Sequence, residues 1–345
     1  MFIFEKMNVK LKDRFNLIGK ISLARITNLA KLRLSFLYSR FSKRPVIWGS
    51  PYAIAFEPTT ACNLRCPECP SGLRKFTRPT GSANFQLFEK TIDQVKKHAF
   101  YLTLYFQGEP LINPDFFKMV EEAKQQKFYV ATSSNAHFFD QKNADKTIKS
   151  GLDRLIISLD GVTQETYSKY RVEGKLQTVL NGINNLVEAK RKLKSTTPYL
   201  IIQFLAFSHN EHEIEAVKKL KQDLGVDEVK IKSAQFYEPD SSELIPENEA
   251  MTRYRKSDDG KYEIKNNLVN RCWRLWTSPV VTQNGQVLPC CFDKDAQHPL
   301  GDLKAVSFDK IWGDKNYRDF RKQVFTDRSK IDICKNCSEG SKVWL

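Results

Sequence analysis

The stretch YAIAFEPTTACNLRCPECP, residues 52–70, joins a short apolar run to three closely spaced cysteines. Residues 52–56 read as a strand, and Cys62, Cys66 and Cys69 follow it with the spacing C-x3-C-x2-C. In parallel βα folds the loops after the strands build the active site, so this loop is a candidate site. Three thiolates on one loop can bind three irons of a four-iron cluster and leave the fourth iron open. A zinc ion that takes its fourth ligand from elsewhere in the chain is the alternative.

Strand-like and helix-like patterns alternate along residues 51–235. Short apolar runs predict six strands, at residues 52–56, 101–106, 128–131, 154–159, 199–207 and 228–232. Amphipathic stretches between them predict helices, at residues 85–98, 114–126, 141–150, 176–194 and 211–224. Such alternation is typical of parallel βαβ units. Because the pattern stops near residue 235, we expect an α/β fold with a partial (β/α)6, TIM-like barrel rather than a full eight-stranded one.

The cysteine triad, at this spacing and after the first strand, resembles the signature of radical S-adenosylmethionine (SAM) enzymes. Polar motifs also follow the next three predicted strands. They are Gly108-Glu109-Pro110, Ser133-Ser134-Asn135 and Ser158-Leu159-Asp160-Gly161. The resemblance implies that the triad binds a [4Fe–4S] cluster. It also implies SAM contacts by seven residues of the later motifs: Gly108, Glu109, Pro110, Ser133, Asn135, Ser158 and Asp160. Gln107 stands where the family often has a second glycine.

These residues have plainer interpretations as well. The motifs that begin at Gly108 and Ser158 are, taken alone, typical of turns that end strands, although their position after successive strands favours the SAM interpretation. Arg171 could hold a carboxylate of SAM or of the substrate, and it is equally interpretable as a surface charge. Glu57, at the end of the first strand, could orient the cysteine loop or have a structural role only.

The resemblance also implies the chemistry. In this family a reduced cluster passes one electron to the sulfonium of SAM, and the C–S bond breaks. The resulting 5′-deoxyadenosyl radical removes a hydrogen atom from an unactivated carbon. A reductant such as flavodoxin or ferredoxin would supply the electron. The protein itself contributes binding, orientation and the exclusion of competing reactions.

Five further cysteines lie in residues 271–345, which we expect to form a small C-terminal iron–sulfur domain. Four of them have a spacing that resembles the auxiliary-cluster domain called SPASM, or Twitch in its shortened form. They are Cys272, Cys290, Cys334 and Cys337. The resemblance implies one auxiliary [4Fe–4S] cluster on these thiolates, with Cys291 as a spare thiol or as the ligand in place of Cys290. A structural zinc ion is the alternative.

Four parts of the chain follow from these patterns. Residues 1–50 are a basic amphipathic extension, and residues 51–235 form the radical SAM barrel. Residues 236–270 are polar and weakly patterned, so we interpret them as a linker to the auxiliary domain at 271–345. Within that last part, two short apolar runs around Asn284-Gly285 predict a β-hairpin.

Positive charge is concentrated at the N-terminus. The chain of 345 residues has 55 Lys and Arg against 40 Asp and Glu, a net charge of +15. Residues 1–45 hold eleven of the basic residues and two acidic ones, a net +9. Apolar residues recur there near helical spacing, at Leu23, Ile26, Leu29, Leu32 and Phe36. This stripe could pack on the main domain, or the basic helix could contact an anionic membrane surface.

Other features limit the location and the partners. No run of about 18 apolar residues predicts a membrane-spanning helix, and no secretory signal precedes the barrel. Clustered cysteines suit metal binding in a reducing compartment, so we expect a cytoplasmic protein, with the inner face of the membrane as a peripheral site. Specific nucleic-acid binding is not expected, because no aromatic-basic motif of a known module occurs.

The function that we expect is hydrogen abstraction from a small or lipid-like metabolite. Shortened auxiliary domains resemble those of alcohol-oxidising enzymes of aminocyclitol biosynthesis, which favours a net two-electron oxidation (dehydrogenation). A peptide maturase is the alternative enzyme, although the 50 residues before the barrel are few for a leader-peptide recognition domain. An alternative of another class is a zinc-stabilised protein that binds nucleic acid or a membrane surface.

Overall fold

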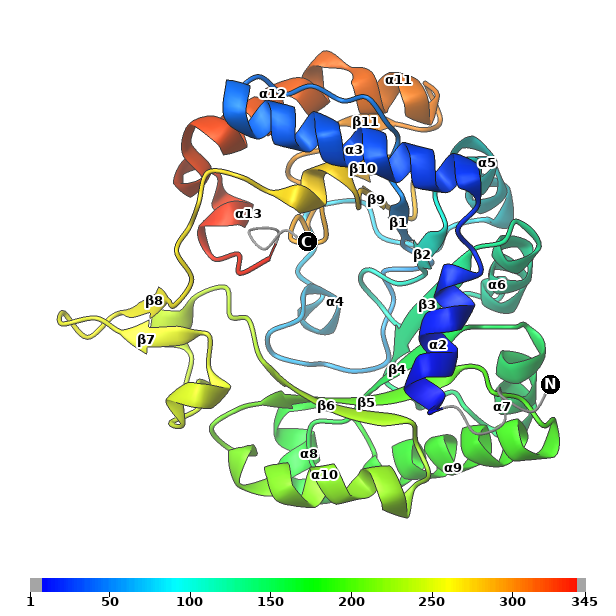
Figure 1. Ribbon diagram of the computed structural model, residues 1–345. Coiled ribbons are helices and arrows are strands. Elements are labelled where there is room, and N and C mark those ends of the chain that lie inside the picture. The colour runs from blue at the N-terminus through cyan, green and yellow to red at the C-terminus, as the bar shows by residue number, and fades with distance from the viewer. Residues whose placement is uncertain (1–7, 340–345) are drawn as a thin grey trace.

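The computed structural model describes residues 8–339, and a curved sheet lies at its centre (Figure 1). Six parallel strands form its barrel part: β1 (Ala53–Phe56), β2 (Tyr101–Thr103), β3 (Tyr129–Ser134), β4 (Arg154–Ser158), β5 (Tyr199–Ala206) and β6 (Glu228–Ser233). Each strand pairs with the next one in chain order. The six predicted strands and the partial barrel are therefore confirmed.

Helices cover the outer face of this sheet (Figure 1). They are α5 (Phe85–Val95), α6 (Phe116–Gln125), α7 (Gln141–Lys149), α8 (Gln164–Tyr170), α9 (Leu176–Lys192) and α10 (Ile214–Asp223). Capping side chains accept a hydrogen bond from the first turn, as Asn84 does at α5 and Asp140 at α7. Each predicted helix is present. The sequence did not predict α8, whose seven residues are too few to show a clear helical period.

Three short strands of the C-terminal segment extend the same sheet beyond β1. They are β9 (Val280–Val281), β10 (Gln286–Leu288) and β11 (Gly301–Asp302), and they are followed by α11 (Phe308–Gly313), α12 (Lys315–Asp327) and α13 (Asp332–Lys335). The hairpin predicted around Asn284-Gly285 is confirmed, since β9 and β10 pair in antiparallel fashion. The sequence did not predict that β9 pairs in parallel with β1. This pairing satisfies backbone groups that an open sheet edge would leave free.

Residues 236–270, which the sequence suggested to be a linker, contain a hairpin of their own. Its strands β7 (Tyr254–Lys256) and β8 (Tyr262–Ile264) pair in antiparallel fashion and project from the side of the molecule (Figure 1). Tyr254 is buried, and its hydroxyl accepts a hydrogen bond of 3.0 Å from the Phe236 N–H. Few apolar residues anchor this hairpin, so its sequence reads as polar and unpatterned.

Within the described residues, two helices, rather than one, precede the barrel. They are α2 (Val9–Ile18) and α3 (Leu23–Ser42). The predicted apolar stripe is only partly buried: Leu32 and Phe36 pack against the C-terminal segment, but Leu23 and Ile26 are exposed. The idea that the whole stripe packs on the main domain is therefore wrong for its first turns. No helix within residues 8–339 has the length and apolar character needed to cross a bilayer.

Candidate cluster and nucleotide site

The first three cysteines lie on the loop between β1 and the short helix α4 (Pro70–Leu73). Burial, followed by the charges of Glu109, Cys69 and Cys66, raises the pKa of the Cys62 thiol to about 11. The three sulfurs are therefore electrostatic neighbours. Deprotonating thiols this close together is unfavourable unless a cation binds them, and metal binding supplies that cation.

Arg171 lies beside this loop, and the sequence had not distinguished it from a surface charge. Its Nε donates to Asp160 Oδ2 at 2.6 Å, and its Nη1 lies 3.7 Å from Cys66 Sγ. Burial raises the pKa of Cys66, whereas the guanidinium charge lowers it. Asp160 is fully buried, and its other oxygen accepts from the Leu205 N–H at 2.7 Å. Both oxygens of Asp160 therefore have protein partners, and its contact with the ribose stays a prediction.

Backbone hydrogen bonds join the loop after β2 to the cysteine loop. The Glu109 N–H donates to the Ala61 carbonyl at 2.8 Å, and the Gly108 N–H donates to Ser71 Oγ at 2.8 Å. Gly108 has φ +72°, and a Cβ there would lie 2.7 Å from the Ala61 oxygen and closer still to that of Thr59. Only glycine allows this approach of the two backbones.

The Glu109 side chain reaches the end of β3. Its carboxylate accepts hydrogen bonds of 2.8 Å from Ser134 Oγ and from the Asn135 N–H. Burial raises the pKa of Glu109 to about 7, although these hydrogen bonds lower it. The Asn135 amide donates to Asn63 Oδ1 at 2.7 Å and lies 3.9 Å from Cys62 Sγ. The structure thus brings Glu109 and Asn135 together with the cysteine loop, as expected from the sequence.

The remaining predicted SAM contacts lie on the same edge of the sheet. Pro110 begins a short 3-10 turn after Glu109, and Ser133 and Ser158 are half-buried at the carboxyl ends of β3 and β4. Because the carboxyl ends of parallel strands meet at one edge, these positions are compatible with a shared ligand. Their contacts with SAM stay predictions.

A buried ion pair fastens the cysteine loop to the C-terminal hairpin. Glu57 accepts two hydrogen bonds from Arg78, at 2.7 and 2.6 Å, and a third from the Gln283 N–H at 3.1 Å. Glu57 therefore has a structural role, one of the two that its sequence position had suggested. Arg78 carried no sequence signal, because its partner lies 21 residues earlier in the chain.

The second group of cysteines is assembled from three separate segments. Cys272, Cys290, Cys334 and Cys337 are all buried. Burial, together with the charge of the Cys272 thiolate, raises the pKa of Cys334 to about 11 and the pKa of Cys337 to about 12. The positive charge of Arg328 lowers both pKa values. The pKa of Cys290 is raised by burial and by the charges of Cys291, Cys272 and Cys337. The four predicted thiols therefore lie together.

Cys291 occupies a different environment from Cys290. Its side chain is half-buried, and its Sγ accepts a hydrogen bond of 3.4 Å from Arg274 Nη1. Lys294 stands between the two cysteine groups: burial lowers its pKa, whereas the charges of Cys69 and Cys291 raise it. Burial of Cys290 beside Cys272 and Cys337 favours it as the fourth thiol of the second group, whereas Cys291 contacts Arg274.

The two donor sets fit iron–sulfur clusters. Within residues 8–339, no three Cys, His, Asp or Glu side chains converge at the spacing of a single metal ion. In a four-iron cluster each thiolate binds a different iron, so its ligands stand farther apart than those around one ion. One set offers three thiols and the other four, all cysteine sulfur, which is the donor chemistry that such clusters require.

Comparisons with known proteins agree with this geometry. The sequence model of the Radical SAM superfamily matches residues 56–220, and that of SPASM, an iron-sulfur cluster-binding domain, matches residues 272–338. The two matches cover about two thirds of the chain. The chain therefore belongs to the radical SAM superfamily and has a C-terminal SPASM domain. Its cofactors are SAM, the [4Fe–4S] cluster that binds SAM, and auxiliary iron–sulfur chemistry in the SPASM domain.

Individual relatives are distant. The chain is 28% identical over 178 residues to the AdoMet-dependent heme synthase of Methanosarcina barkeri, covering 51% of this chain and 49% of that protein. It is 29% identical over 140 residues to the mycofactocin maturase MftC of Mycobacterium ulcerans, covering 41% of this chain and 37% of that protein. The chain thus spans half or less of these two relatives. The structure of Streptococcus suis SuiB bound to S-adenosylmethionine matches this chain with a TM-score of 0.61 at 13% identity. The match covers 87% of this chain and 73% of SuiB, and it shows that the two share a fold.

Proposed function

We propose that this chain removes a hydrogen atom from a small or lipid-like metabolite and that the net reaction is a two-electron oxidation. The observation that carries the proposal is the second cysteine group. Its four thiols are buried together, in a segment whose strand β9 pairs with β1 of the barrel. Four protein ligands leave no position for a substrate, so this site is suited to accept an electron.

The ligands follow from the two groups. Cys62, Cys66 and Cys69 would hold the SAM-binding cluster, with one iron left for SAM. The auxiliary cluster would be held by Cys272, Cys290, Cys334 and Cys337. When bound and reduced, the first cluster supplies the electron that cleaves SAM to a 5′-deoxyadenosyl radical.

The chain's own residues would bind and orient SAM and the cluster. Glu109, buried and fixed by Ser134 and Asn135, offers carboxylate lone pairs for the ammonium group of SAM. Arg171, fixed by Asp160, places a positive charge 3.7 Å from Cys66 Sγ and so stabilises its thiolate. Gly108 keeps the two loops in contact.

The proposed oxidation balances in two steps. The substrate loses one hydrogen atom to the nucleoside radical, and the substrate radical then loses one electron and one proton. The electron goes to the auxiliary site, from which a flavodoxin or ferredoxin would remove it, and the proton passes to solvent water. We place this reaction in the cytoplasm, where thiols remain reduced.

Peptide maturation is the second candidate. It is favoured by the match of 140 residues to the maturase MftC, although that match covers 37% of the relative. A chemically modified peptide product would select this candidate over oxidation of a metabolite.

Anaerobic purification and SAM cleavage test the proposal. The full chain should carry about eight irons, from two four-iron clusters, and release 5′-deoxyadenosine from SAM with dithionite. The variant C62A/C66A/C69A should keep about four irons and lose cleavage. Deuterium transfer into 5′-deoxyadenosine then reports on candidate substrates. A colourless protein with stoichiometric zinc, or cleavage that survives the triple substitution, would refute the proposal.

A further inference from the structure

The helix α3 packs with its polar side inward. The residues that it buries are mostly polar: Arg25, Asn28, Leu32, Ser35, Phe36 and Ser39. Large apolar side chains on its other side are exposed, and Leu23 and Phe41 have 79% and 80% of their surface open to solvent. Burial of apolar surface normally drives helix packing, so this inverted arrangement indicates that the outer side is adapted to a further contact.

Hydrogen bonds specify this orientation of α3. The guanidinium of Arg25 donates to the carbonyls of Lys127 at 3.0 Å and of Lys96 at 2.9 Å. The amide of Asn28 donates to the Ser50 carbonyl at 2.7 Å. The exposed apolar side is therefore part of a defined packing and not the result of a loosely placed helix.

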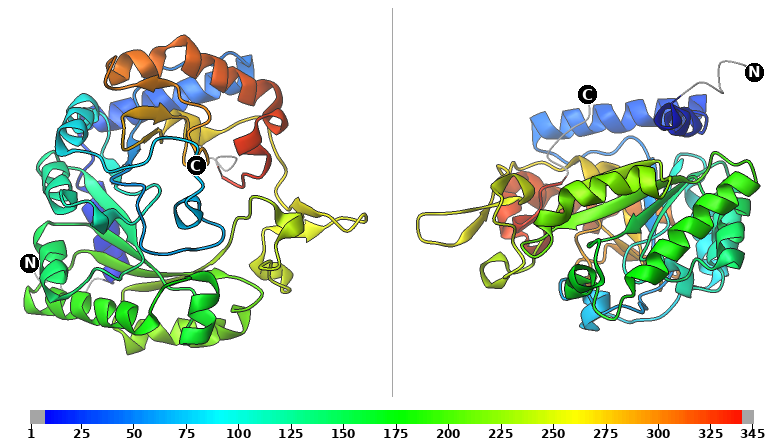
Figure 2. Two further views of the ribbon diagram at one scale, coloured as in Figure 1. Left: turned by 180° about the vertical axis from the view of Figure 1, so that it is seen from behind. Right: turned by 90° about the horizontal axis from the view of Figure 1, so that it is seen from below.

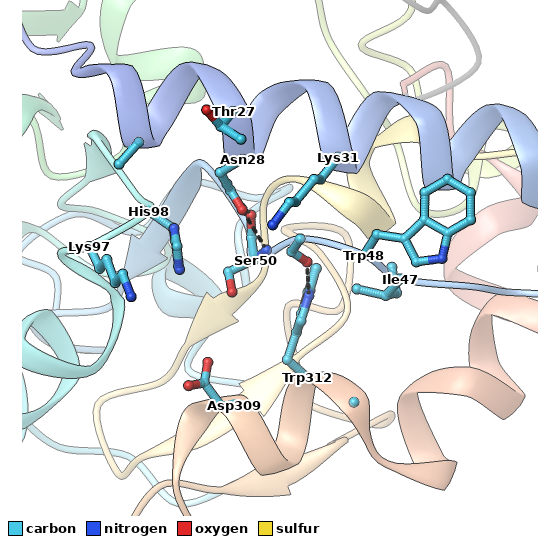
Figure 3. A pocket seen from close by; sticks show the side chains of 13 residues that line it. Thr27, Asn28, Lys31, Ile47, Trp48, Ser50, Lys97, His98, Asp309 and Trp312 are labelled. Atoms are coloured by element: carbon cyan, nitrogen blue, oxygen red, sulfur yellow. Dashed lines mark hydrogen bonds between the residues drawn. The ribbon is translucent and has the colours of Figure 1, made fainter.

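A cavity beneath α3 is lined by both polar and apolar side chains. Its volume is about 530 Å³, and Figure 3 shows Asn28, Lys31, Lys97 and Asp309 among the residues that line it. A helix rotated to bury its apolar side would place leucine and isoleucine side chains against these charged groups.

The exposed apolar side continues from α3 onto α2. The right-hand view of Figure 2 shows the two helices as one outer layer on one side of the molecule. Ten of the fifteen exposed large hydrophobic side chains within residues 8–339 lie in residues 9–48. These ten, which we call the docking face, are Val9, Leu11, Phe15, Ile18, Leu23, Ile26, Leu34, Tyr38, Phe41 and Trp48. In soluble monomers, so many exposed large apolar side chains in one part of the chain indicate a site of interaction.

Positive charge accompanies the docking face. Between Asp13 and Glu57 the sequence has eight Lys and Arg and no acidic residue. Asp13 itself is buried and paired with Arg154, so it does not offset this charge at the surface. Tyr38 and Trp48, with ring centroids 5.7 Å apart, add the amphipathic aromatic rings that are enriched at membrane–water interfaces.

We propose that the docking face binds the surface of an anionic phospholipid bilayer and lies in its headgroup region. Apolar side chains on helices rich in Lys and Arg are the composition of helices that lie in a membrane interface. Each basic residue near an anionic surface adds attraction. A second copy of this chain fits less well, because a two-fold contact would bring two basic faces together.

Docking in this way holds the cysteine loop away from the bilayer. Next to the starts of the strands, Asn16 Nδ2 of α2 donates to Asp153 Oδ1 at 2.7 Å, and Lys10 pairs with Glu228 at 3.2 Å. Asp153 immediately precedes β4, and Glu228 begins β6. The cysteine loop leaves the other end of the strands, so the bound enzyme would present its nucleotide site to the aqueous side.

Vesicle flotation with the full chain tests the proposal. We expect binding to phosphatidylcholine vesicles that contain phosphatidylglycerol, and at least about tenfold weaker binding to pure phosphatidylcholine or at high salt. The variant L34E/F41E should weaken binding at least about tenfold and leave SAM cleavage unchanged. The control L193E/V306E makes the same charge change at residues that are 38% and 42% exposed outside the docking face, and should bind as the wild type does.

Several outcomes would overturn the proposal. One is absence of wild-type binding to the anionic vesicles, and another is an equal loss of binding in L193E/V306E. A stable dimer that L34E/F41E dissociates would assign the docking face to a second copy instead. Tryptophan emission gives an independent measure: brominated lipid should quench it in the wild type and quench it less in W48F, whereas equal quenching would place Trp48 outside the bilayer. Because SAM cleavage is measured separately, failure of membrane binding leaves the proposed reaction standing.

Discussion

The two cysteine groups of this protein are built in opposite ways. The first is carried by one loop, and its Cys62 and Cys69 remain half-buried. Asn135, just after β3, lies near Cys62, and Arg171 lies near Cys66. The second collects its thiols from three distant segments and buries all four. Three thiols on a partly exposed loop leave room for a further ligand, whereas four buried thiols do not. The difference in local construction matches the two roles that we propose, nucleotide binding at the first group and electron transfer at the second.

Two adjacent cysteines, Cys290 and Cys291, differ most clearly in their surroundings. Cys290 is buried with the other thiols of the second group, whereas the sulfur of Cys291 accepts a hydrogen bond from Arg274. We expect C290A to lose about four of eight irons and C291A to keep them all, as measured by iron analysis and absorption of the anaerobic protein. Both variants should still cleave SAM, because the first group is intact. Loss of iron in C291A alone would exchange the two assignments.

The next largest effect concerns the charge beside the first group. R171M would leave Asp160 buried without its cation, which costs about 3–5 kcal/mol of unfolding free energy. Denaturant unfolding should show this loss, and R171M/D160N should recover most of it because no unpaired charge remains. SAM cleavage should stay low in the double variant, since the Cys66 thiolate still lacks its positive neighbour. Equal stability of R171M and the wild type would show that Arg171 is not needed to compensate Asp160.

The local sequence pattern predicted the first cysteine group but not the contacts around it. The triad and the six strands follow from spacing and alternation over a few residues. The pairing of β9 with β1 joins residues more than 200 positions apart, and no local pattern encodes it. The role of Arg171 stayed open for the same reason, because its partners Asp160 and Cys66 come from other elements. The sequence also left open whether the apolar side of α3 faces inward or outward, since helical periodicity gives a stripe but not the direction in which it faces.

A third test uses the pH dependence of stability at Glu109. Its pKa is raised from 4.5 to about 7 by burial, so the folded state favours the protonated form. This contribution is fully present below pH 4.5 and is lost as the pH rises through 7, a change of ~3 kcal/mol in unfolding free energy. Denaturant unfolding of the reduced, cluster-free chain should show this fall, and E109Q should lack it. The exposed control E89Q should retain the wild-type pH profile, and a profile unchanged in E109Q would mean that Glu109 ionises without penalty.

The smallest expected effect tests the contact between the two loops at the first group. A methyl group at Gly108 would lie 2.7 Å from the Ala61 oxygen at φ +72°, so G108A must shift one loop against the other. Strain of this kind costs on the order of 1–3 kcal/mol. Because the shift displaces Glu109 and the cysteine loop together, we expect the KM for SAM to rise about tenfold while the iron content is kept. The control G313A adds the same methyl group where no atom lies within 4 Å, and it should change neither quantity. A normal KM in G108A would show that this close approach does not position SAM. The cysteine loop by itself would then be sufficient to keep the first group open to the nucleotide.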